Sequence, residues 1–153
     1  MVKIQLEELH VKMNMASAED IELYIMKHSA DFFPAFHTKN NVAEYAEKLR
    51  KLGNTYELWY NGELDALMAV YFNEQLKQIY VPYICTAGAH YAPHVGQYLF
   101  RMIMHFSTPF EYVRLEVRKN NLRAVTFYLK QGFTIKHDAG EKVLLEYKLC
   151  KNQ

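Results

Sequence analysis

The sequence lacks an excess of charge of either sign. Its 18 lysines and arginines are balanced by 17 aspartates and glutamates, which leaves a formal net charge of +1. Proteins that bind nucleic acid or anionic membranes in a general way usually carry a strongly basic surface or segment. Because this chain has no comparable excess of positive charge, we expect neither nucleic acid nor a membrane among the partners of this protein.

Cysteine is scarce as well, and long apolar runs are missing. Cys85 and Cys150 lie far apart and show none of the paired spacings of a zinc site or a disulfide framework. The sequence shows no signal-peptide pattern and no apolar run of the roughly 20 residues that span a bilayer. We therefore expect a reduced, soluble, cytoplasmic protein that holds no metal.

Aromatic residues, in contrast, are abundant. The chain has 12 tyrosines and 9 phenylalanines, and half of its 153 residues are hydrophobic. Repeats and low-complexity segments are absent, so we expect one domain, residues 1–153, and a domain of this size buries about 70% of the surface that its unfolded chain exposes. The rings suit either a dense core or a pocket lined with aromatic side chains.

The stretch 79–99 organises the rest of the chain. Residues 79–86 are largely apolar on both faces, which predicts a central strand. Small and turn-forming residues at 88–93 allow a close approach of the backbone to a ligand before Val95 opens a helix. Free N–H groups at a helix N-terminus bind phosphate, so the pattern indicates an anion site, with an ordinary strand-to-helix turn as the alternative.

The other elements follow from apolar periodicity and from turn residues. The predicted strands cover residues 3–12, 56–60, 64–72, 79–86, 112–118, 133–136 and 142–149, and the predicted helices cover 18–30, 42–52, 95–106 and 122–131. A capping box at 17–20 begins the first helix, and Asn61-Gly62 predicts a two-residue hairpin turn. Because a helix connects strand 79–86 to strand 112–118, we expect these two strands to pair in parallel.

A second motif lies at residues 117–133, VRKNNLRAVTFYLKQGF. The residues that define it are Val117, Asn121, Ala124, Phe127, Tyr128, Gly132 and Phe133. With the order of elements, this motif resembles the GNAT superfamily of N-acetyltransferases from Tyr56 onward, whereas the first 55 residues fit only in layout. The resemblance implies an α+β, three-layer GNAT-like fold whose mostly antiparallel sheet has one parallel strand pair at the cofactor site and about four flanking helices.

The resemblance also implies acetyl-coenzyme A as co-substrate. The implied cofactor-binding residues are Ile84, Cys85, Thr86, Tyr91, Ala92, Pro93, His94, Val95, Gly96, Gln97, Asn121 and Tyr128. The pyrophosphate loop departs from the family pattern, since Tyr91 replaces the usual Arg or Gln and His94 replaces the first Gly. Three basic residues beside the second motif, Arg118, Lys119 and Arg123, are either further phosphate contacts or simply solvated.

In the reaction that the resemblance implies, a neutral amine attacks the thioester carbonyl and a thiolate leaves. Backbone amides near residues 84–86 would polarise the carbonyl. By the same resemblance, the catalytic residue Tyr128 protonates the thiolate, and a phenol with a reference pKa of ~10 suits that role; the alternative is a core tyrosine.

The base that deprotonates the amine is not decided by the sequence. The candidates are a water chain and the side chains of His37, Glu57, Tyr80, Tyr83 and His90. His90 and His94 have the i and i+4 spacing of a metal site, but Pro93 between them argues against one helix that presents both.

The acceptor pocket is predicted from aromatic residues. The candidate substrate-binding residues are Phe32, Phe33, Phe36, His37 and Tyr83, although the phenylalanines also suit a hydrophobic plug. We predict acetyl transfer to a primary amine of a small molecule, and we favour an amino sugar over an arylalkylamine or a peptide N-terminus because rings stack on sugar faces.

Other functions stay open at this stage. The altered pyrophosphate loop allows a catalytically weak or inactive GNAT-fold module that binds acyl-coenzyme A, and a peptide or protein N-acetyltransferase also fits. A scaffold that pairs through an exposed strand edge is the third alternative. We expect a monomer or a homodimer.

Overall fold

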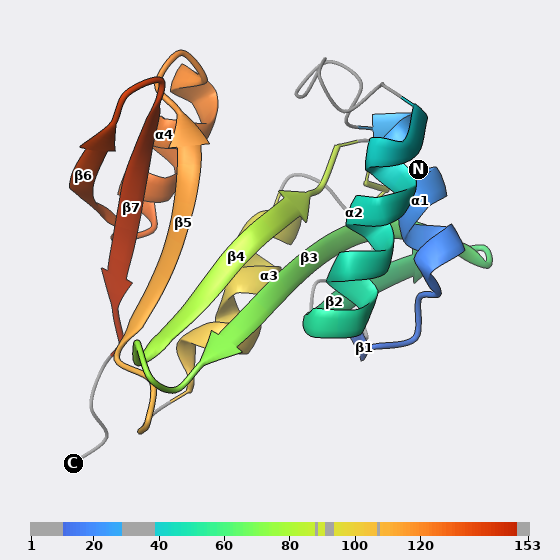
Figure 1. Cartoon of the computed structure of the whole chain (residues 1–153), viewed down its shortest axis with the longest axis horizontal. Helices are drawn as coiled ribbons and strands as arrows, with labels where there is room; N and C mark the ends of the chain where they lie inside the picture. The colour runs from blue at the N-terminus through green and yellow to red at the C-terminus, as the bar shows by residue number, and fades with distance from the viewer. Residues whose placement is uncertain (1–10, 29–38, 88, 91–93, 107, 150–153) are drawn as a thin grey trace. The chain divides into compact units, whose positions relative to one another are not determined.

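The computed structural model describes residues 11–28, 39–87, 89–90, 94–106 and 108–149 (Figure 1). The strands are β1 (Lys12–Met13), β2 (Asn54–Tyr60), β3 (Glu63–Asn73), β4 (Gln78–Cys85), β5 (Tyr112–Arg118), β6 (Thr134–Ala139) and β7 (Lys142–Lys148). The helices are α1 (Ala18–His28), α2 (Lys39–Leu52), α3 (Val95–Met104) and α4 (Leu122–Lys130). This order of elements confirms the prediction, while residues 3–10 of the expected first strand lie outside the described residues.

The strands form a seven-stranded sheet in the order β1-β2-β3-β4-β5-β7-β6, so β4 is central, as predicted. The expected parallel pair is β4 with β5, in a register from Gln78↔Tyr112 to Tyr80↔Arg114. The pairs β1–β2, β2–β3, β5–β7 and β6–β7 are antiparallel. The predicted α+β fold with a mostly antiparallel sheet and one parallel pair is confirmed.

Local capping and turn chemistry fix several boundaries. The Asp20 N–H donates to Ser17 Oγ at 3.0 Å, and the Ser17 N–H donates to Asp20 Oδ2 at 2.9 Å, which is the predicted capping box of α1. Asn61 and Gly62 have φ angles of 50° and 79°, as a type I′ hairpin turn requires. Asn121 caps α4 by accepting the Ala124 N–H at 3.2 Å.

Some boundaries differ from those that the sequence patterns indicated. Helix α2 begins at Lys39, three residues before the apolar stripe from which the helix was predicted, because its first turn is polar. Strand β6 extends to Ala139 rather than to residue 136, and the hairpin turn lies at Gly140 and Glu141, where Gly140 adopts a φ of 81°.

Contacts divide the chain into two compact units. The first consists of Met1–Val70 and Tyr83–Leu99, and the second of Tyr71–Pro82 and Phe100–Gln153. In the first unit, α1 packs against α2 (Figure 1) and both helices bury an apolar stripe. The buried residues of these stripes are Ile21, Tyr24, Ile25, Val42, Ala46 and Leu49. The single domain expected from the sequence stays a prediction.

The second unit is built around aromatic rings. The Phe100 ring is 5.6 Å from the Phe133 ring and 5.8 Å from the Tyr128 ring, both in edge-on geometry. Such pairs add ~0.5–1.5 kcal/mol to the stabilisation from buried area. Here, the abundant aromatic residues form a dense core.

Candidate functional site

The carboxyl end of β4 lies among side chains of the first unit. Along β4, side chains alternate between buried and half-buried, and the strand ends at Cys85, which is buried. Ile84 and Thr86, the neighbours of Cys85, are half-buried. The chain then turns, because the Ala89 N–H donates to the Thr86 carbonyl at 3.1 Å. A buried strand that ends in a tight turn is a rigid platform for functional groups.

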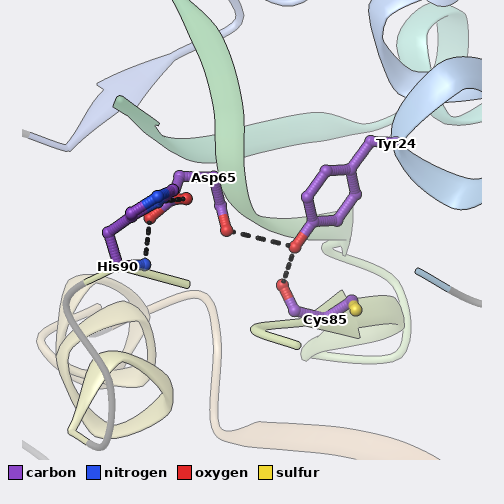
Figure 2. Close-up of polar contacts among 4 residues, drawn as sticks. All are labelled: Tyr24, Asp65, Cys85 and His90. Carbon is purple, nitrogen blue, oxygen red and sulfur yellow. Dashed lines mark hydrogen bonds and ion pairs between the residues drawn. The ribbon is translucent and has the colours of Figure 1, made fainter. Parts of the chain in front are cut away.

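The hydroxyl of Tyr24 holds this strand end in place (Figure 2). It donates to the Cys85 carbonyl at 2.9 Å and lies 3.3 Å from the Asp65 carbonyl, so one side chain of α1 bridges the backbones of β3 and β4. Burial raises the pKa of Tyr24 far above its usual value, and the neighbouring Cys85 adds to the shift. Tyr24 therefore stays a neutral donor.

Asp65 and His90 form an ion-pair contact near this end of the strand (Figure 2). The Asp65 carboxylate is 6% exposed, and its Oδ1 lies 2.6 Å from Nδ1 of His90. Its Oδ2 accepts the backbone N–H of His90 at 2.8 Å. One carboxylate thus orients both the imidazole ring and the main chain that carries it.

The His90 ring has a second contact that fixes its plane. It stacks on the ring of Tyr60, with centroids 3.8 Å apart and an angle of 13° between the planes. The side chain is nevertheless 53% exposed. Because an ionised carboxylate only accepts hydrogen bonds, Nδ1 of His90 carries the proton of that contact. No described residue is hydrogen-bonded to Nε2 of His90.

The predicted cofactor loop is described in part. Residues 91–93 and the aromatic candidates at 32–37 lie outside the described residues. His94 is exposed just before α3, whereas Gln97 is half-buried and Val95 and Gly96 are buried in the first turn of that helix. N–H groups in the first turn of a helix have no partner within the helix, so the start of α3 fits an anionic group.

The second motif belongs to the second unit. Asn121 is the N-cap of α4, and Tyr128 is 8% exposed on the same helix. The ring of Tyr128 meets the Phe100 ring at 89° and the Phe133 ring at 67°. The predicted acid is therefore held in a fixed ring orientation by packing.

Basic residues next to this motif are partly engaged. The Lys119 ammonium lies 2.6 Å from the Asp138 carboxylate. Nε of Arg118 is buried and has no hydrogen-bond partner among the described residues. A pocket of about 300 Å³ is lined by Arg118, Lys119, Asn120 and Glu141.

Comparisons with known proteins bear on the fold. No protein-family model and no curated protein sequence matches the chain. Among solved structures, an acetyltransferase from Thermus thermophilus matches 92% of this chain and 98% of its own, with a TM-score of 0.73 and 13% identity. An acetyltransferase of the GNAT family from Streptococcus pneumoniae matches 92% of this chain and 100% of its own, with a TM-score of 0.62 and 15% identity.

A third match was solved with a ligand. The N-acetyltransferase PseH of Campylobacter jejuni, in complex with acetyl coenzyme A, matches 93% of this chain and 99% of its own, with a TM-score of 0.59 and 17% identity. This chain has the GNAT fold. The fold that the second motif predicted is thereby confirmed.

Within the GNAT fold of this chain, Glu57 is a structural carboxylate. It is fully buried, and it accepts the backbone N–H groups of Met15 and Ala16, the Thr55 hydroxyl and the Trp59 indole N–H. A group with four donors and no exposure does not reach a substrate, which argues against Glu57 as the base.

The two tyrosine candidates are poor bases as well. Burial raises the pKa of Tyr80, and Glu116 and Tyr71 add to the shift. Tyr83 is 5% exposed, and its ring packs edge-on against Tyr45 at 6.4 Å. His37 lies outside the described residues.

Two residues of this site were missed in the sequence. Asp65 lies in a strand whose neighbouring residues 66–70 are all buried and apolar, so a lone carboxylate there was the available signal. Tyr24 showed only helical spacing, and nothing in the sequence indicated that its hydroxyl reaches Cys85, 61 residues away.

Two further features are absent from the described residues. No three His, Cys, Asp or Glu side chains in this part of the chain gather as metal ligands do. None of the helices in the same residues is both long and apolar enough to cross a membrane.

Proposed function

We propose that this protein is an N-acetyltransferase that moves an acetyl group from acetyl-coenzyme A to a primary amine of a small molecule. The observation that carries the proposal is the extent of the structural similarity. It covers 92–93% of this chain and 98–100% of three acetyltransferases, one of which was solved with acetyl coenzyme A. Similarity over whole chains, rather than over one motif, favours a shared chemistry over a chance likeness of parts.

One feature in each unit, considered by itself, supports the binding of the coenzyme. In the first unit, the N–H groups at the start of α3 suit a pyrophosphate, and the buried Gly96 lets helix and ligand approach closely. In the second unit, the Asn121 side chain combines its capping role with amide donors for a cofactor. When bound, acetyl-coenzyme A supplies the acetyl thioester.

The residues of this chain supply the rest of the chemistry. Backbone N–H groups around Ile84 and Thr86 polarise the thioester carbonyl, and loss of one such donor typically costs ~100-fold in turnover. The Tyr128 hydroxyl donates a proton to the departing thiolate. The ring packing of Tyr128 holds its hydroxyl in one direction, which such a donor needs.

We propose an amino sugar as the acceptor. The chain is rich in tyrosine and phenylalanine, and its net charge of +1 leaves no acidic excess for a polyamine or a basic peptide. Aromatic side chains stack on the apolar faces of sugar rings. A cytoplasmic monomer or homodimer remains our prediction for the protein as a whole.

The proposal is tested in two steps on the full chain. Calorimetric titration with acetyl-coenzyme A should give a saturable isotherm, and the ligand at 100 times its dissociation constant should stabilise the protein by about 2.7 kcal/mol. Thiol release is then followed with amino sugars, arylalkylamines and peptides as acceptors. Turnover with at least one small amine is the expected result.

Other outcomes would overturn the proposal in distinct ways. Absence of binding at millimolar acetyl-coenzyme A would show that the protein does not use this coenzyme. Tight binding without thiol release for any amine indicates the regulatory module that the changes at Tyr91 and His94 allow. Turnover with peptides alone indicates a peptide N-acetyltransferase.

A further inference from the structure

The pair of Asp65 and His90 has the geometry of a carboxylate-oriented base. The Asp65 carboxylate is almost fully buried, and it holds Nδ1 of His90 at 2.6 Å and the backbone N–H of the same residue at 2.8 Å. Stacking on Tyr60 at 3.8 Å removes the remaining freedom of the ring. Three contacts therefore fix an imidazole that is still half exposed.

This arrangement leaves one ring nitrogen for chemistry. With the proton on Nδ1 facing the carboxylate, a neutral imidazole has its lone pair on Nε2. No described residue occupies Nε2 by a hydrogen bond. In hydrolases too, a carboxylate orients the imidazole through Nδ1–H while Nε2 accepts the proton, and this arrangement makes histidine a base.

The position of the pair in the fold is set by the Tyr24 hydroxyl. That hydroxyl contacts the carbonyls of both Asp65 and Cys85, so the start of β3 and the end of β4 lie together in the first unit (Figure 2). His90 follows Cys85 after one turn of chain. The pair is thus adjacent to the strand end whose amide groups we propose to polarise the thioester.

The groups that face the pair come from three elements. They are Tyr60 at the end of β2, Tyr24 and His28 from α1, and the backbone carbonyl of Cys85 from β4. Asp65, a member of the pair, supplies the negative charge, and this charge partly offsets the lowering of the pKa of His28 by burial. Tyr24 is a neutral donor, so the described groups around His90 provide one anion and no fixed cation.

We propose that His90 is the catalytic base that takes the proton of the acceptor amine, and that Asp65 is its positioning residue. The proposal rests on the proposed function. The acceptor ammonium gives one proton to Nε2, and its nitrogen then bonds to the acetyl carbon while the carbon–sulfur bond breaks. The nitrogen loses a second proton as the amide forms, the thiolate takes up one proton, and the imidazolium releases its own to solvent, so each turnover yields an amide, a thiol and one proton.

The first test compares His90→Gln with His105→Gln, a change at an exposed histidine outside the site. Acetyl-coenzyme A affinity should be unchanged in both variants, and the melting temperature should fall only for His90→Gln, which loses the stacking on Tyr60 and the imidazole contact to Asp65. For His90→Gln, kcat should fall by ~100-fold or more, and the rise of kcat/KM with pH that we expect for the wild type should be absent. His105→Gln should keep the wild-type pH profile.

Asp65→Asn tests the positioning role. An asparagine can turn its amide toward Nδ1 and favour the tautomer with the proton on Nε2, so kcat should fall by ~10-fold or more at unchanged acetyl-coenzyme A affinity. Nitrogen-15 NMR of histidine-labelled protein without any ligand gives a readout that is independent of turnover. The wild type should show the Nδ1–H tautomer at His90, and Asp65→Asn should change it.

The outcomes that overturn this inference differ from those that overturn the proposed function. If wild type turns over and His90→Gln keeps its kcat and pH profile, His90 is not the base and the acetyltransferase proposal stands. If His90→Gln loses acetyl-coenzyme A affinity but keeps its pH profile, His90 holds the cofactor instead. A wild type that binds no acetyl-coenzyme A removes both proposals together.

Discussion

At the scale of single residues, the carboxylate of Glu57 organises the chain before α1. Its two oxygens accept the N–H groups of Met15 and Ala16 and the side-chain donors of Thr55 and Trp59, at distances of 2.6 to 3.2 Å. These donors join the segment that leads into α1 to strand β2. A buried charge is tolerated here because each oxygen has strong partners.

We expect Glu57→Gln to lower the free energy of unfolding by about 2–3 kcal/mol. The amide replaces one acceptor oxygen with a donor, so at least one buried N–H or hydroxyl loses its partner. Urea denaturation measures the difference. Glu47→Gln, an exposed change on α2, is the control and should alter the free energy of unfolding by less than about 0.5 kcal/mol.

A second residue-scale prediction concerns Tyr128. If its hydroxyl is the proton donor, Tyr128→Phe should keep the melting temperature and the acetyl-coenzyme A affinity while turnover falls by ~100-fold or more. The control is Tyr147→Phe, because Tyr147 packs on Phe133 in the same aromatic core. A Tyr128→Phe protein with normal turnover and a stability loss of ~1 kcal/mol would make the hydroxyl structural.

At the scale of elements, the turn after α4 depends on a glycine. Gly132 has a φ of 103°, and an added Cβ would lie 3.1 Å from Cε2 of Tyr147. The Phe133 N–H donates back to the Tyr128 carbonyl at 3.1 Å, so this turn also anchors the end of the helix that carries Tyr128. Side chains other than glycine are strained in this conformation.

We expect Gly132→Ala to destabilise the protein by about 2 kcal/mol, from backbone strain and contact with the Tyr147 ring. Gly140→Ala is the matched control, because Gly140 has a φ of 81° but nothing within 4 Å of an added Cβ. It should cost about 1 kcal/mol from strain alone. Equal losses for the two variants in thermal denaturation would contradict the steric contribution of Tyr147.

At the scale of the whole molecule, a helix-end histidine links stability to pH. Burial lowers the pKa of His28, and Lys27 adds to the shift while Asp65 opposes it. The folded protein therefore binds this proton less readily than the unfolded chain does. The contribution of His28 to stability is complete above the unfolded value of about 6.5 and is lost as the pH falls toward the folded pKa.

We expect the melting temperature to fall between pH 7.5 and pH 5.5, and we expect His28→Gln to make this dependence weaker. The control is His137→Gln at an exposed position of β6, which should leave the wild-type slope in place. A slope that is identical in wild type and His28→Gln would show that His28 does not contribute. Differential scanning calorimetry at several pH values makes the comparison.

The sequence by itself determined the order of the elements and the class of the fold. Local signals were sufficient there: the capping box at Ser17 and Asp20, the hairpin turn at Asn61 and Gly62, and the cap at Asn121 each depend on residues within three positions of one another. The parallel pair of β4 and β5 followed from the helix predicted between the two strands.

Only the tertiary structure decided which polar groups meet. Asp65 and His90 are 25 residues apart, and Tyr24 and Cys85 are 61 residues apart. Their contacts depend on how β3, β4 and α1 pack against one another, and the periodicity of apolar residues along the sequence does not predict this packing. Glu57 shows the same limit. As one charged residue in an apolar strand, it was compatible with a catalytic base or with a buried structural carboxylate. The donors of Thr55, of Trp59 and of a distant loop make it a structural carboxylate.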